Sequence, residues 1–139
     1  MKIKLALASL ACAGALFADI VVAPTALPAN AQNFVKQYFG GAQIALVKQD
    51  IDSFDVVLND GTEIDFLING QWKEVDAKYK PLNTAFLPQA VVAKVKAAQP
   101  NAAIIKVEKK INMYKFKLNN MMEVYADLNG NILGQKFDD

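Results

Sequence analysis

The fold is decided by residues 27–76, which read LPANAQNFVKQYFGGAQIALVKQDIDSFDVVLNDGTEIDFLINGQWKEVD. This stretch aligns without a gap on residues 87–136, which read LPQAVVAKVKAAQPNAAIIKVEKKINMYKFKLNNMMEVYADLNGNILGQK. Apolar and turn residues recur at the same offset, for example Leu27-Pro28 and Leu87-Pro88, or Asn69-Gly70 and Asn129-Gly130. A fixed period of this length indicates one supersecondary unit used twice. We therefore expect a single domain at residues 19–139, built of two tandem repeats that a connector at residues 77–86 joins.

Each repeat is predicted to contain one helix followed by about four short strands. Pro28 and Pro88 suit the first turn of a helix, and apolar residues follow them at helical spacing. Gly40-Gly41 and Pro100 end these helices. Beyond them the apolar period changes to two, as in Phe54, Val56 and Leu58, which is typical of half-buried strands. The predicted fold class is α+β, with a curved antiparallel sheet and the helices on one face.

Turn residues set the register of one predicted hairpin in each repeat. Asn59-Asp60-Gly61 fits a three-residue loop with Gly61 in a left-handed conformation. This loop places Asp55 opposite Asp65, a pair of like charges that costs some stability. In the second repeat Met121 stands at the position of Gly61, where a left-handed backbone would be strained. We therefore expect the two loops to differ in shape.

Asn69-Gly70 sets the register of the next hairpin. This dipeptide is the usual signal for a two-residue turn, and such a turn pairs Leu67 with Trp72. Trp72 is then expected to point away from the face that the helices cover. The same reasoning in the second repeat places further residues on this open face, in the pairs Lys115 with Tyr125, Lys117 with Glu123, and Ile132 with Asp127.

The first eighteen residues have the layout of a secretory signal peptide. Lys2 and Lys4 precede an alanine-rich apolar run at residues 5–16, and small residues follow it. The apolar run is too short to span a bilayer as a stable helix. We expect cleavage after Ala18, or slightly earlier at Ala13-Gly14-Ala15, and a periplasmic or secreted product without a stable membrane span.

The composition disfavours several classes of function. Cys12 is the only cysteine and falls inside the predicted signal peptide, where a lipid anchor is its alternative fate; the chain has no histidine and no arginine. The remaining chain lacks a Cys–His pair for nucleophilic catalysis and the usual zinc ligands. Without Lys2 and Lys4, the 15 lysines fall to 13, against 14 acidic residues, so a basic nucleic-acid footprint is missing. We expect a protein that is not an enzyme, binds no cofactor or metal, and does not bind nucleic acid.

The two repeats differ in charge more than in pattern. Residues 27–79 carry four lysines and eight acidic residues, whereas residues 87–139 carry eight lysines and five acidic residues. Such an asymmetry often reflects only a solvated surface. Its functional interpretation is electrostatic steering of a bipolar partner, or head-to-tail association of two copies.

A set of residues on the predicted open face forms a candidate surface for a protein partner. An apolar centre ringed by charges suits a protein interface, and adjacent methionines at a hairpin tip are adaptable contact residues. The alternative is that the connector covers Trp72 near Tyr79 and Phe86, and that the methionines pack against the neighbouring repeat. The predicted partner-binding residues are Trp72, Leu67, Tyr125, Ile132, Lys115, Lys117, Asp55, Asp65, Met121 and Met122.

Several short motifs occur in a fixed order along the chain. They are Leu27-Pro28, Phe39-Gly40-Gly41, the segment DGTEIDF at residues 60–66 and the segment NGQWKEVD at residues 69–76. This order resembles the PepSY-like family of exported bacterial proteins, which is described as beta-lactamase-inhibitor-like. The resemblance covers nearly all of the chain after the signal peptide. It implies a tandem architecture of one helix and four strands with a curved sheet, a function in binding or inhibition, and no catalytic residues.

These observations predict an exported, non-catalytic binding module of the inhibitor-like kind. It would present its open sheet face to a protein partner in the cell envelope. The alternative is a periplasmic carrier of a small ligand or peptide held between the helices and the sheet.

Overall fold

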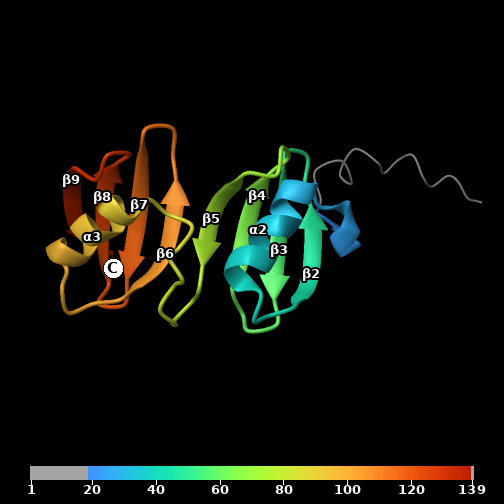
Figure 1. The fold of residues 1–139 in the computed structure, drawn as a ribbon, viewed down its shortest axis with the longest axis horizontal. Coiled ribbons are helices and arrows are strands. Elements are labelled where there is room, and N and C mark those ends of the chain that lie inside the picture. Colours follow the sequence, from blue (N-terminus) through green and yellow to red (C-terminus); the bar gives the residue numbers. More distant parts are fainter. Residues whose placement is uncertain (1–18, 139) are drawn as a thin grey trace, which may run out of the picture.

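The computed structural model describes residues 19–138, so the predicted signal peptide and Cys12 lie outside the described residues (Figure 1). The described chain forms two α-helices, one short 3-10 helix and nine strands. The helices are η2 Pro24–Ala26, α2 Ala29–Phe39 and α3 Gln89–Ala98. The strands are β1 Ile20–Val22, β2 Ile44–Gln49, β3 Ser53–Leu58, β4 Glu63–Leu67, β5 Trp72–Asp76, β6 Ile104–Lys109, β7 Met113–Leu118, β8 Met122–Asp127 and β9 Ile132–Phe137.

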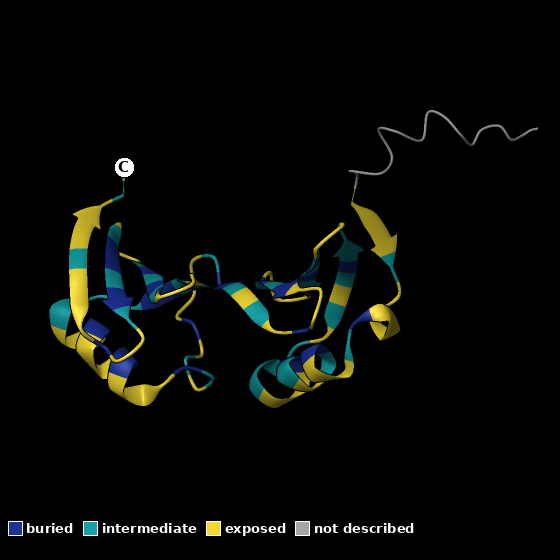
Figure 2. Ribbon diagram, turned by 90° about the horizontal axis from the view of Figure 1, so that it is seen from above, coloured by how far each residue is buried: buried dark blue, intermediate teal, exposed yellow. Residues whose placement is uncertain are grey.

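All nine strands belong to one antiparallel sheet in which the spatial order follows the chain order from β1 to β9. Every strand therefore pairs with its neighbours in sequence, and no connection crosses the sheet. The junction between β5 and β6 is short, with three residue pairs from Glu74–Glu108 to Asp76–Lys106. Figure 2 shows that the sheet is strongly twisted and that both α-helices lie on the same side of it.

The predicted fold class, an α+β tandem repeat of one helix plus about four strands, is wrong. The structure is mostly β: one continuous nine-stranded sheet that carries only two α-helices, of 11 and 10 residues. The connector does not separate two units, because the Ala77 N–H donates to Ile105 O at 2.9 Å and the Leu82 N–H donates to Ile104 O at 2.8 Å. These hydrogen bonds lay β6 against β5. The strand β1, which the sequence pattern did not indicate, extends the same sheet beyond β2.

The hydrophobic core lies between the helices and the sheet. Alternate residues of the inner strands point into it and are fully buried, among them Val56, Ile64, Phe66, Val75, Val107, Phe116 and Val124. Helix α2 contributes Ala31 and Val35, and α3 contributes Val91 and Val95. Pro28 and Pro88 stand directly before the two helices, where a missing N–H costs nothing. Burial of each large apolar side chain stabilises the fold by about 1.5–3 kcal/mol.

Four hairpins of the sheet share one loop geometry. Each has three loop residues, and the N–H of the third donates back to the carbonyl before the loop at 2.8–3.2 Å. The third residue has a positive φ in all four, namely Gly61 (92°), Gly70 (86°), Met121 (70°) and Gly130 (95°). The expectation of a different loop shape at Met121 is therefore wrong. The flanking strands and the hydrogen bond from Met121 to Leu118 hold this residue in the left-handed region.

Replacing Met121 with glycine is expected to raise the free energy of unfolding by about 0.5–1 kcal/mol. Glycine has no Cβ to strain the left-handed backbone, and this gain exceeds its larger entropy in the unfolded chain. Urea denaturation followed by circular dichroism measures the change. The neighbouring variant Met122→Gly is the control, because Met122 lies in β8 and pairs with Phe137, so it should destabilise. Equal losses in both variants would contradict the prediction.

The sheet ends on one side with β9, which pairs only with β8. Its apolar residues Leu133 and Phe137 are exposed, and so is Lys136 between them.

In the part of the chain that the structure describes, neither helix has the length and apolar character needed to cross a membrane.

Candidate binding surfaces

The sheet face away from the helices carries two parallel rows of polar residues, and we call it the open face. Residues that pair across neighbouring strands form each row, and their sequence neighbours are the core residues that point the opposite way. One row runs from β2 to β8 through Lys48, Asp55, Asp65, Glu74, Glu108, Lys115 and Tyr125. The other runs from β4 to β9 through Glu63, Asp76, Lys106, Lys117, Glu123 and Lys136.

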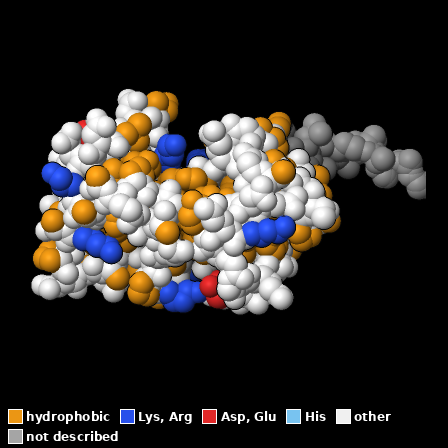
Figure 3. Space-filling view, in the orientation of Figure 1, with side chains coloured by type: hydrophobic (Ala, Val, Ile, Leu, Met, Phe, Trp, Pro, Cys, Tyr) orange, Lys and Arg blue, Asp and Glu red, His pale blue; other side chains and the backbone are white. Residues whose placement is uncertain are grey.

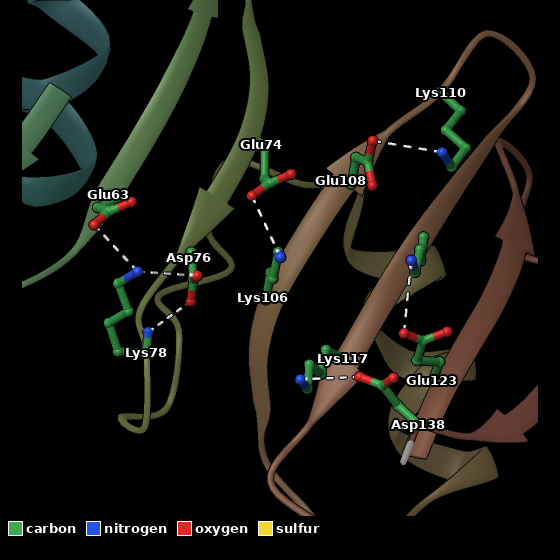
Figure 4. A network of polar contacts seen from close by, with 11 residues as sticks. Glu63, Glu74, Asp76, Lys78, Lys106, Glu108, Lys110, Lys117, Glu123 and Asp138 are labelled. Atoms are coloured by element: carbon green, nitrogen blue, oxygen red, sulfur yellow. Dashed lines mark hydrogen bonds and ion pairs between the residues drawn. The ribbon is translucent and has the colours of Figure 1, made fainter. Parts of the chain in front are cut away.

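Charge is divided across the open face. The part over β3, β4 and β5 carries acidic residues from both rows, whereas β6, β7 and β9 contribute lysines. Ion pairs cross the boundary, as Figure 4 shows for Lys106 and Glu74, whose charged atoms lie 3.4 Å apart. Lys78, from the connector, bridges Glu63 at 3.1 Å and Asp76 at 3.5 Å. Such solvent-exposed pairs contribute at most about 1 kcal/mol each, so they organise the surface more than they stabilise the fold.

Glu123 of β8 is the exception among these charges, because it is only 4% exposed. The Tyr125 hydroxyl donates to its carboxylate at 2.8 Å, and Lys115 and Lys136 lie at 3.6 and 3.8 Å. The hydrogen bond to Glu123 raises the pKa of Tyr125. Three surrounding groups thus compensate a nearly buried charge. Tyr125 and Lys115 are engaged in this network, so Tyr125 acts as a polar partner there and not as part of an apolar patch.

Asp55 and Asp65 lie opposite each other on β3 and β4, as the three-residue loop predicted. Burial, followed by the charge of Asp55 and a hydrogen bond between the two carboxyl groups, raises the pKa of Asp65 to about 7. Among the described residues, no lysine forms an ion pair with either carboxylate. Near neutral pH the pair therefore holds a proton that exposed aspartates would have lost.

Replacing Asp65 with asparagine is expected to stabilise the protein at pH 8 by about 1–2 kcal/mol, after allowance for solvent screening. In the wild type the raised pKa means that the folded state binds more protons than the unfolded state between about pH 4 and pH 7. Stability therefore falls as the pH rises through this interval, and the variant loses that dependence. Urea denaturation at pH 4.5, 6 and 8 measures it, with Asp52→Asn in an exposed loop as control. A pH profile that is the same in Asp65→Asn and wild type would rule the coupling out.

Trp72 does not lie on the open face, contrary to the sequence prediction. The loop before it has three residues and not two, so Trp72 pairs with Phe66, and an irregularity at Lys73 restores the register at Asp65–Glu74. Its indole packs on the helix side, edge-on to Phe86 of the connector (ring centroids 5.1 Å apart) and stacked on Tyr114 (6.3 Å). The alternative prediction, that the connector covers Trp72, is thus the one observed. Phe86 provides this cover, whereas Tyr79 is exposed.

The same error of loop length affects the last hairpin. Ile132 pairs with Ala126 and not with Asp127, and an irregularity follows it. The pairs Lys115–Tyr125 and Lys117–Glu123 agree with prediction.

The structure does not bring the predicted site residues together as one apolar patch. Asp55, Asp65, Lys115, Lys117 and Tyr125 share the open face. Met121 lies at the hairpin tip between β7 and β8 and Met122 at the start of β8, far from Trp72 along the strands, and Ile132 belongs to the edge strand β9. The sequence pattern missed Lys78 and Lys106, and it placed Glu123 on the open face without including it among the site residues, although all three belong to the ionic network.

Trp72 and Leu67 line a cleft at the end of β5 and β6. The cleft has a volume of about 720 Å³, and the other residues that form it are Gln71, Lys73, Glu108, Lys109, Lys110, Ile111, Asn112 and Met113. Figure 3 shows a hollow at the upper margin of the molecule, between its two halves, with hydrophobic side chains along it and lysines beside it. Sequence reasoning missed this cleft, because it arises where two strands diverge.

Among the described residues, no three or more side chains of the types that bind metals (His, Cys, Asp or Glu) are grouped so that they could hold a metal ion.

The fold and these surfaces define a small, mostly β protein with one uncovered, charged sheet face. Residues 52–134 match the family model described as "Putative beta-lactamase-inhibitor-like, PepSY-like". The chain belongs to this PepSY-like family, as the order of its motifs indicated. No curated protein matches the sequence.

Two solved structures are similar over nearly the whole described chain. A "putative calcium-regulated periplasmic protein" from Bacteroides thetaiotaomicron is 32% identical, with a TM-score of 0.80, and the match covers 85% of this chain and 96% of that one. A "putative periplasmic protein of unknown function" from Bacteroides vulgatus is 31% identical, with a TM-score of 0.79, and the match covers 86% and 99%. Both relatives are described as periplasmic proteins, which agrees with the predicted periplasmic or secreted location of this chain.

Proposed function

We propose that the protein is a non-catalytic, inhibitor-like binding module whose open face docks a protein partner in the cell envelope. The observation that carries this proposal is the Asp55–Asp65 pair: two carboxyl groups lie opposite each other, and among the described residues neither forms an ion pair with a lysine. Lys48 lies opposite Asp55 on β2 but forms no ion pair with it, so the two adjacent carboxyl groups form a favourable position for a lysine or arginine of another protein.

The division of charge supports the same proposal. Acidic residues gather over β3 to β5 and lysines over β6, β7 and β9, so a partner with the complementary arrangement would be both attracted and oriented. Both α-helices of the described chain lie on the other side of the sheet (Figure 2). The ion pairs around Lys106 and Lys117 hold their side chains in place, which lowers the entropy lost on association.

Binding at the Asp55–Asp65 pair would be coupled to proton release. A cation placed beside Asp65 favours its ionised form, so the partner must displace the proton that the free protein holds below about pH 7. Affinity is therefore expected to be lower at pH 5.5 than at pH 8, by up to about thirtyfold if the complex requires ionised Asp65 and the pKa of free Asp65 is about 7.

The immobilised protein can be used to capture partners from periplasmic extract, with the double variant Asp55→Asn/Asp65→Asn and the control Asp52→Asn in parallel. A genuine partner is retained by the wild type and the control, and its affinity, measured with the purified pair, falls at least tenfold in the double variant. The double variant also loses the pH dependence. A partner that binds the wild type and the double variant equally would refute docking at this pair.

The packing does not favour a small ligand held between the helices and the sheet, which is the other function suggested by the sequence. Rings fill this space beneath α2: Phe34 lies edge-on to Phe66 at 5.6 Å and to Phe86 at 5.2 Å between centroids.

A further inference from the structure

We propose that the cleft between the ends of β5 and β6 binds a small anionic amphiphile, a molecule with an apolar chain and a carboxylate at one end, such as a medium-chain fatty acid. The cleft adjoins the open face, since Glu108 belongs to one of its polar rows, but the inference does not depend on the function proposed for that face.

The cleft forms because two paired strands diverge. β5 and β6 pair from Asp76–Lys106 to Glu74–Glu108, and no ladder pair follows toward Trp72 and Lys109. The irregularity at Lys73 rotates Trp72 toward the helix side, so the indole forms one wall of the opening instead of filling it. A volume of about 720 Å³ lies within the range of small-molecule sites in proteins.

The lining of the cleft is apolar and partly uncovered. Its apolar residues are Leu67 of β4, Trp72 of β5, Ile111 of the loop between β6 and β7, and Met113 at the start of β7. Ile111 is 91% exposed and Leu67 is 37% exposed, although both are large apolar side chains. An apolar chain laid into the cleft would remove this surface from water.

Lysines at the rim determine the sign of the charge that the occupant carries. Lys73, Lys109 and Lys110 border the cleft, against the single carboxylate of Glu108. Glu108 is paired with Lys110 at 3.4 Å, whereas Lys73 and Lys109 form no ion pair within the described residues. Two uncompensated cations beside an apolar groove complement a molecule with an apolar chain and one anionic end.

Tryptophan fluorescence can report directly on binding in the cleft, because Trp72 is the only tryptophan of the chain and lines the cleft. Titration of the protein with dodecanoate, below the concentration at which it forms micelles, should change the Trp72 emission with a saturable curve. The same chain with a neutral end (dodecanol) or a cationic end (dodecyltrimethylammonium) should bind at least fivefold more weakly. Raising the salt concentration should weaken dodecanoate binding, because the lysines are solvent-exposed.

Variants test separately how the lysine charges and the apolar surface contribute to dodecanoate binding. Lys73→Gln/Lys109→Gln should weaken dodecanoate binding at least fivefold, and Lys94→Gln/Lys96→Gln on α3 is the matched control that leaves it unchanged. Ile111→Asp, at a highly exposed position that the fold does not need, should weaken binding at least tenfold. Equal affinity for the three head groups, equal affinity of the two lysine variants, or no saturable change in emission would each overturn the proposal.

Discussion

Replacing Phe66 with alanine is expected to lower the free energy of unfolding by about 3–5 kcal/mol. Phe66 lies in β4, is fully buried, and contacts Phe34 of α2 edge-on. Alanine would leave a cavity between the sheet and the helix, which the surrounding strands cannot close because they are held in register on both sides. For a domain of this size such a loss is a large part of the total stability.

Urea denaturation followed by circular dichroism measures this loss. The adjacent Leu67→Ala is the control: Leu67 is partly exposed and points toward the cleft, so its removal should cost less than about 1 kcal/mol. Comparable losses for the two variants would mean that α2 does not pack on β4 as described.

Replacing Trp72 with alanine is expected to cost about 2–4 kcal/mol of stability, slightly less than for a fully buried ring. The indole packs on Phe86 and Tyr114, and Phe86 in turn contacts the rings of Phe34, Tyr38 and Phe39. Trp72 therefore joins the connector to α2 and to β7. Because its removal weakens this cluster, Trp72→Ala reports on folding and is unsuitable as a test of partner binding.

Thermal and urea denaturation both measure the effect of Trp72→Ala. Tyr79→Ala is its control: Tyr79 is an aromatic residue of the connector but is 93% exposed, so its loss should cost less than about 0.5 kcal/mol. A variant Trp72→Ala as stable as the wild type would show that the indole lies on the open face after all, as the two-residue turn predicted.

The sequence predicted the strand positions and part of the register, for reasons that are local. The residues Asn59-Asp60-Gly61 determine the length and shape of their own loop, so the Asp55–Asp65 and Val56–Ile64 pairs agree with prediction. Asn69-Gly70 was misassigned because Asn-Gly occurs both in two-residue turns and at the end of three-residue loops, and in the structure Ile68 is part of the loop. This one extra loop residue is sufficient to turn the Trp72 side chain from the open face to the helix side of the sheet.

The sixty-residue period could not predict the overall architecture. The period indicates which segments resemble each other. The continuity of the sheet depends instead on pairs such as Val75–Val107, in which one residue belongs to the first repeat and the other to the second. The open face was partly predictable from alternation along β3, β4, β7 and β8. The cleft was not, because it depends on the end of the β5–β6 ladder and on an irregularity at Lys73, neither of which leaves a pattern in the sequence.

The uncovered edge strand β9 affects how the protein behaves when it is concentrated. The free backbone groups of such a strand can template the addition of a strand from another copy, and Leu133 and Phe137 would make this contact more adhesive. Lys136 precedes Phe137 on the same strand and is exposed on the opposite face, and edge-to-edge stacking of copies would bring these like charges close together. A single charged side chain on this edge strand therefore opposes side-by-side association of copies through the exposed sheet border.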